Sequence, residues 1–93
     1  MVKLPEIPKY IRSMEKRIGA VIILVSEAGD TGQINRIISD HSELILGRQG
    51  IPLRDRDTSV ISLVLEGDTD RMGSLTGKLG RLQGVKVKSV LAG

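Results

Sequence analysis

The sequence predicts an α+β fold: a ferredoxin-like βαββαβ two-layer sandwich with an antiparallel four-stranded sheet. Two observations lead to this class. Four short segments are rich in β-branched and apolar residues, and two segments between them repeat apolar residues at helical spacing. The resulting order is strand, helix, strand, strand, helix, strand. The length of 93 residues allows one folded domain.

The first strand and the first helix come from adjoining segments. Residues 18–25 are apolar on both faces and largely β-branched, which is typical of a central strand. Residues 27–32 are turn formers, and Asp30 or Thr31 can cap the next helix because each offers a side-chain oxygen to free amide groups. The apolar stripe of that helix falls at i, i+3, i+4 and i+7: Ile34, Ile37, Ile38 and His41.

The second and third strands form a predicted hairpin. Residues 44–53 predict a strand that Gly47 and Gly50 interrupt. Residues 54–57 alternate Arg and Asp, which is typical of a tight charged connection. Residues 58–65 then predict the third strand.

The second helix and the last strand complete the pattern. Residues 67–70 predict another capped turn, and Gly84 predicts the helix end because glycine suits a C-cap position. Between them the apolar stripe consists of Met72, Leu75, Leu79 and Leu82. Residues 85–91 alternate Val and Lys at first, and lysines on an edge strand oppose pairing with another chain.

The first strand carries apolar residues on both of its faces. Ala20, Ile22 and Leu24 alternate with Val21, Ile23 and Val25. Strands of this kind are usually covered on both sides. In a chain this short the second cover has to come from another subunit or from the N-terminal arm, so we expect a homo-oligomer, with a dimer as the default.

Four glycines follow one another at helical spacing in the second helix: Gly73, Gly77, Gly80 and Gly84. A glycine inside a helix costs about 1 kcal/mol relative to alanine. Several of them suggest that another backbone approaches closely. Packing within the chain is the favoured explanation, and a partner or ligand contact is the alternative.

The positive charge of the chain lies in its N-terminal arm, residues 1–17. The arm holds five basic and two acidic residues, a net charge of 5 − 2 = +3, whereas residues 18–93 hold nine of each and are neutral. A basic arm can touch nucleic acid or an acidic partner. The alternative is a solubilising tail.

Composition excludes several classes of site and function. Zero Cys removes disulfides, thiolate metal sites and thiol catalysis, and one His is too few for a metal site, so we expect no metal and no cofactor. RNA-binding members of this fold stack bases on aromatic residues, which the central strands lack. The longest apolar run, residues 20–25, is too short to cross a bilayer, and we expect a cytoplasmic protein.

No catalytic constellation is evident in the sequence. His41 lies on an apolar stripe, with no nucleophile elbow near it. The enzyme alternative is a small acylphosphatase-like protein, which needs an Arg and an Asn beside an anion-binding loop. Arg36 and Asn35 are adjacent on a helix and point in different directions, which argues against that activity.

Two segments carry a resemblance to a known family. Residues 45–52, ILGRQGIP, and residues 73–88, GSLTGKLGRLQGVKVK, resemble small regulators associated with the iron-only hydrogenase system of anaerobic bacteria. The resemblance covers residues 18–91 and implies an ACT-like fold without established catalytic residues. ACT modules bind amino acids near the loop after the first strand, which implies a ligand site at Asp30, Thr31 and Gly32. The alternative is that Gly29 and Gly32 only shape the turn.

We therefore expect a non-enzymatic regulatory module that senses a small ligand or docks on a partner. The alternative from another class is a DNA-binding transcriptional regulator that acts through the arm.

Overall fold

The computed structural model describes residues 16–93, so the predicted arm lies outside the described part except for Lys16 and Arg17. The elements follow one another as β1 (Arg17–Val25), α2 (Thr31–Asp40), the 3-10 turn η1 (Ser42–Leu44), β2 (Ile45–Leu53), β3 (Thr58–Gly67), α3 (Thr69–Gly80) and β4 (Val85–Leu91). This order confirms the predicted ferredoxin-like α+β fold. The turn η1 was not predicted.

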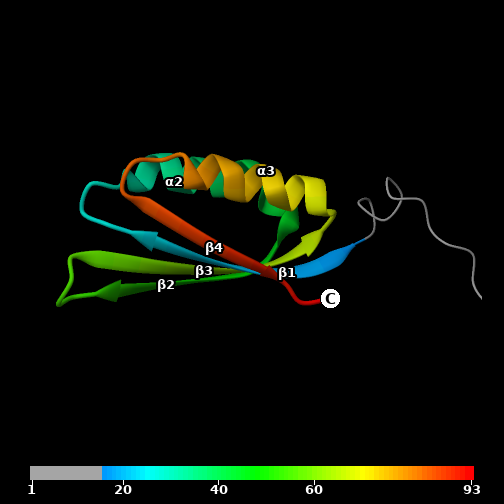
Figure 1. Ribbon diagram of the computed structural model, residues 1–93, viewed down its shortest axis with the longest axis horizontal. Coiled ribbons are helices and arrows are strands. Elements are labelled where there is room, and N and C mark those ends of the chain that lie inside the picture. Colours follow the sequence, from blue (N-terminus) through cyan, green and yellow to red (C-terminus); the bar gives the residue numbers. More distant parts are fainter. Residues whose placement is uncertain (1–15) are drawn as a thin grey trace, which may run out of the picture.

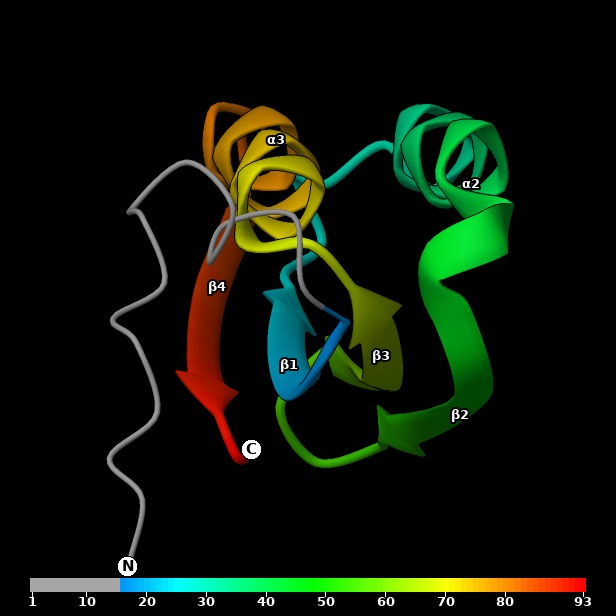
Figure 2. The same cartoon turned by 90° about the vertical axis from the view of Figure 1, so that its right-hand side faces the viewer.

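The four strands form one antiparallel sheet in the order β2-β3-β1-β4. Both helices lie on the same face of this sheet (Figure 1). Figure 2 shows α3 over β1 and β4, and α2 on the side of β2 and β3. This is expected, because crossover connections in such sheets share one hand. The opposite face carries no helix of the described chain.

The hydrophobic core lies between the sheet and the helices. One face of each central strand is buried there, and α2 and α3 contribute the stripes predicted for them. The buried residues are Val21, Ile23, Val25, Ile61, Leu63 and Leu65 from the strands, Ile34, Ile38, Met72, Leu75 and Leu79 from the helices, and Leu44 from η1. Burial that alternates along each strand explains why period-two patterns locate the strands.

Aspartates cap both helices, in the turns where caps were predicted. Asp30 Oδ1 accepts hydrogen bonds from the amides of Gly32 at 2.9 Å and Gln33 at 3.2 Å. Asp68 Oδ1 accepts from the amide of Arg71 at 2.8 Å. Helix α3 ends at Gly80, four residues before Gly84, which adopts a positive φ of 74° in the turn into β4.

The glycines of β2 do not interrupt it, contrary to the prediction. Gly47 and Gly50 both lie within the continuous strand, and a Cβ on either would meet nothing within 4 Å. A shift of register between Ile45 and Gly47 marks the irregularity instead. Because the strand lies at the sheet edge, extra twist at this point is tolerated.

Large apolar side chains remain exposed on the face opposite the helices. On β1 they are Ile22, 43% exposed, and Leu24, 38% exposed. Val64 on β3 and Val90 on β4 project from the same face, as their register with Ala20 shows. β1 is therefore apolar on both faces, as predicted. One face forms the core, and the other is uncovered in the described chain.

Within the described residues, none of the helices has the length and apolar character that a membrane crossing requires.

Candidate functional site

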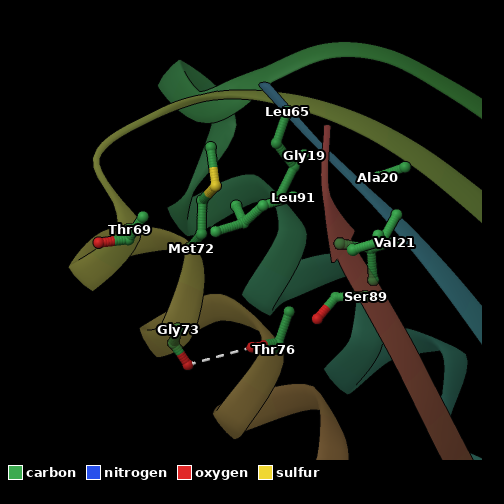
Figure 3. Close-up of a pocket in the computed structure, with 11 residues that line it drawn as sticks. Gly19, Ala20, Val21, Leu65, Thr69, Met72, Gly73, Thr76, Ser89 and Leu91 are labelled. Atoms are coloured by element: carbon green, nitrogen blue, oxygen red, sulfur yellow. Dashed lines mark hydrogen bonds between the residues drawn. The ribbon is translucent and has the colours of Figure 1, made fainter. Parts of the chain in front are cut away.

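A groove runs between α3 and β4 on the outer side of the helix. Its narrow end is a cavity of about 220 Å³ between the first half of α3 and the last residues of β4. Figure 3 shows the side chains around it. Apolar walls come from the side chains of Val21, Leu65, Met72 and Leu91, and hydroxyls come from Thr69, Thr76 and Ser89.

The polar groups of the cavity are few and uncharged. Thr76 Oγ1 donates a hydrogen bond to the carbonyl of Gly73 at 3.3 Å, drawn as a dashed line in Figure 3. No charged side chain lines the cavity among the described residues. Ligand sites typically combine apolar walls with a few placed polar groups, in volumes of about 300–1,000 Å³. This cavity is smaller than that range, and its lining is apolar with a few hydroxyls. It therefore suits a small, uncharged, partly apolar molecule.

The groove widens toward the end of α3, where glycines form its helical wall. Gly73, Gly77 and Gly80 line this open part together with Val85 and Val87. A Cβ added to any of the three glycines would meet nothing within 4 Å. The predicted close packing inside the chain is therefore wrong for these three residues.

Helix geometry explains this error. At about 100° per residue, the glycines fall roughly opposite the stripe formed by Met72, Leu75 and Leu79. The stripe faces the core, so the glycines face away from it. The fourth glycine, Gly84, does meet another backbone, since its Cβ would lie 2.6 Å from the amide nitrogen of Gly29.

The predicted ligand residues Asp30, Thr31 and Gly32 lie together at the start of α2. The Asp30 carboxylate already binds the free amides of Gly32 and Gln33. A ligand carboxylate would need the same amides, because a helix N-terminus attracts anions through them. The site stays a prediction, and a ligand there would have to displace Asp30.

His41 joins the two helices beneath the surface. It is 6% exposed, and its Nδ1 donates to the carbonyl of Ile37 at 2.8 Å. Its Nε2 is then the acceptor for Ser74 Oγ on α3, at 3.5 Å. No acidic side chain completes a triad among the hydrogen bonds of the described residues. The arrangement explains His41 as a link between the end of α2 and α3.

Asn35, one of the two residues considered for acylphosphatase chemistry, is bonded to the edge strand of the sheet. Arg48 on β2 donates to Asn35 Oδ1 on α2 at 2.7 Å. This hydrogen bond occupies the amide oxygen of Asn35 and joins the helix to the edge strand. Among residues 16–93, no group of three His, Cys, Asp or Glu side chains is placed to hold a metal.

Comparison with known proteins shows the family. Residues 17–89 match the family model described as "TM1266-like: Iron-only hydrogenase system regulator, putative". The chain belongs to this family. A solved structure of an uncharacterized protein, TM1266 from Thermotoga maritima, is similar at 41% sequence identity and a TM-score of 0.80. The alignment covers 85% of this chain and 100% of that chain. The search of curated proteins found no match.

The resemblance expected from residues 45–52 and 73–88 is thereby confirmed, and so is the fold that it implied. The groove itself was missed at the sequence level. Its signal was present as glycines on the far side of α3 from the apolar stripe, with Thr69 and Thr76 between these two faces.

Proposed function

We propose that this member of the TM1266-like family is a non-enzymatic regulatory module of an iron-only hydrogenase system, and that it senses a small molecule in the cavity between α3 and β4. The family description supports regulation. The observation that supports sensing is the cavity itself, with its apolar walls and the hydroxyls of Thr69, Thr76 and Ser89.

The free space beside α3 argues for an external occupant. Alanine at Gly73, Gly77 or Gly80 would clash with nothing and would stabilise the helix by about 1 kcal/mol at each position. Side chains there would narrow the groove. Retaining glycine therefore keeps this surface accessible at the expense of helix stability.

A ligand in the cavity would connect α3 to the sheet edge. The cavity touches Ser89, Val90 and Leu91 on β4, and no described strand pairs with the outer edge of β4. A bound molecule would hold this edge against Met72 and Thr76. A ligand in the cavity would therefore alter the surface that β4 presents to a partner protein. We expect the partner to respond to this change.

The start of α2 is the second place at which a ligand can bind on the present proposal, through Asp30, Thr31 and Gly32. The groove is the better supported of the two. Its polar groups have free capacity, whereas the α2 amides are already bonded to Asp30.

The test is a thermal-shift screen of the purified chain against small uncharged molecules that are partly apolar, such as short alcohols and amides. Amino acids, nucleotides, divalent metals and thiol metabolites complete the screen. A ligand at 100 times its Kd stabilises the fold by about 2.7 kcal/mol, which raises the Tm of a domain of this size by about 10–20 °C. Gly73→Leu places a side chain in the groove and should abolish the shift without lowering the Tm of the free protein. Gly50→Leu is the matched control, since Gly50 also has free space but lies on β2.

A hit that survives Gly73→Leu would contradict the cavity as the binding site. A screen without any hit would contradict small-molecule sensing and would favour the alternative, in which the module docks directly on a partner protein.

A further inference from the structure

The uncovered face of the sheet has a regular composition, which the strand register makes explicit. Three rows of residues cross it from β4 through β1 and β3 to β2. The first row is Lys86, Leu24, Val60 and Ile51. The second row is Lys88, Ile22, Ser62 and Gln49. The third row is Val90, Ala20, Val64 and Gly47. The centre of the face is thus apolar, and its lysines lie on the edge strand β4.

The size of this face matches a protein interface. Strands of 7 to 10 residues, rising about 3.3 Å per residue and spaced about 4.8 Å apart, give a flat area of about 500 Å². Because side chains project from the face, its accessible surface is larger than this flat area. Each partner in a standard protein interface contributes about 800 Å², which is similar. One extended segment would cover only part of the width, whereas a second sheet would cover all of it.

The rows fit a second copy of the chain in one orientation. With a two-fold axis between β1 and β3 and parallel to them, β1 of each copy lies over β3 of the other. Ile22 then meets Ser62, and Val90 meets Gly47, so that large side chains face small ones in these two rows. In the first row Leu24 meets Val60, and Lys86 meets Ile51 at the rim, where the ammonium group can reach water. Lys88 meets Gln49, whose amide oxygen can accept from the ammonium group.

Charge opposes the perpendicular orientation when it is centred on the second row. A two-fold axis running across the strands through the second row would place Lys88 over Lys88 of the other copy. Like charges that face each other in a buried interface are costly.

We propose that the sheet face formed by these three rows binds a second copy of this chain, with the two-fold axis parallel to β1 and β3. The dimer is a sandwich of two sheets, with the helices and the α3–β4 groove on its outer sides. The groove stays accessible in this arrangement, so the proposal holds whether or not the cavity binds a ligand.

The first test is the mass in solution by light scattering and sedimentation. The wild-type chain of 10.1 kDa should behave as a dimer at micromolar concentration. Ile22→Glu should weaken the dimer by at least about thirtyfold, since a charge would lie at the centre of the interface. Gln33→Glu makes the same charge change on α2 and should leave the dimer intact. Ile22→Thr keeps the β-branched shape and should weaken association in a chain that still folds.

The second test determines the orientation of the two copies by crosslinking between introduced cysteines. The chain has no native Cys, so only the introduced residues can react. A short bismaleimide should crosslink the Lys88→Cys/Gln49→Cys double variant into dimers. It should not crosslink Lys88→Cys alone, because the two copies of residue 88 lie on opposite sides of the axis. The three strand spacings between β4 and β2, about 14 Å in all, prevent a crosslink within one chain.

A monomer at 100 μM would overturn the proposal, and so would a dimer that Ile22→Glu leaves unchanged. A crosslinked dimer from Lys88→Cys alone would overturn the orientation.

Discussion

The backbones of Gly29 and Gly84 are in contact, where the turn after β1 meets the turn before β4. A Cβ on Gly84 would lie 2.6 Å from the amide nitrogen of Gly29, and one on Gly29 would lie 2.6 Å from Cγ1 of Val25. The carbonyl of Gly84 accepts a hydrogen bond from the amide of Ser26 at 2.8 Å. This contact ties the turn after β1 to the turn before β4, and it leaves no room for a side chain.

Gly84→Ala should therefore be strongly destabilising. Alanine in the left-handed region costs about 1–2 kcal/mol, and the clash with Gly29 adds to that. We expect a loss of at least about 2 kcal/mol in the free energy of unfolding, measured by urea denaturation. A neutral Gly84→Ala variant would mean that the two turns do not touch.

Gly77→Ala should have the opposite effect. Gly77 lies in the middle of α3, and its Cβ would meet nothing within 4 Å. The helix should gain up to about 1 kcal/mol, because alanine loses less backbone entropy. A destabilised Gly77→Ala would show that another backbone does occupy this side of α3. Gly84→Ala in the same urea series is the matched comparison.

The hydrogen bond from His41 to Ile37 should matter more than the contact with Ser74. His41→Ala removes a buried ring and a 2.8 Å hydrogen bond, and should cost about 2 kcal/mol or more. Ser74 is exposed and lies 3.5 Å from Nε2, so Ser74→Ala should cost less than about 0.5 kcal/mol. If urea denaturation gave the two variants equal losses of stability, the contact with Ser74 would be what holds the imidazole in place.

Substitutions at Asp30 separate capping from ligand binding. Asp30→Ala should lower stability by about 1 kcal/mol, and Asp30→Ser should restore most of it, because serine also caps. If the residue only caps α2, the Asp30→Ser variant keeps the full thermal shift with any ligand found in the screen. A change of that shift in either direction in a stably folded Asp30→Ser variant would place the ligand at the start of α2.

The DNA-binding alternative depends on the N-terminal arm, and the structure reduces its charge. Arg17 belongs to β1, where its Nε donates to the carbonyl of Gly93 at 3.0 Å. Without Arg17 the arm consists of residues 1–16, which hold four basic and two acidic residues, so its net charge is 4 − 2 = +2. We expect weak DNA binding that Lys3→Glu and Lys9→Glu do not change in a salt titration. A steep salt dependence that these variants remove would support the DNA-binding alternative.

Much of the fold could be predicted because burial alternates so regularly. Val21, Ile23 and Val25 point to the helices while their neighbours point away, and β4 has the bounds predicted for it. The predicted end of α3 at Gly84 was wrong, because the helix ends at Gly80. Leu82 continues the apolar spacing beyond that end, since it still packs against the core.

The candidate site was harder to predict, since it depends on the space between two elements. The sequence shows glycines on α3, but not that β4 lies beside them at a distance that leaves a cavity. The ligand site at Asp30 was predicted because the resembled ACT modules bind amino acids near the loop after the first strand. Those same residues serve as a cap, and local sequence cannot distinguish the two roles.

The most direct test of the sensing proposal is an amide NMR titration of the full chain with the strongest compound from the thermal-shift screen. Binding in the α3–β4 groove predicts the largest shifts at Gly73, Thr76 and Ser89, and their loss in the Gly73→Leu variant. Shifts centred on Gly32 and Gln33, with Gly73 and Ser89 unchanged, would contradict the groove as the site at which this regulator reads its signal.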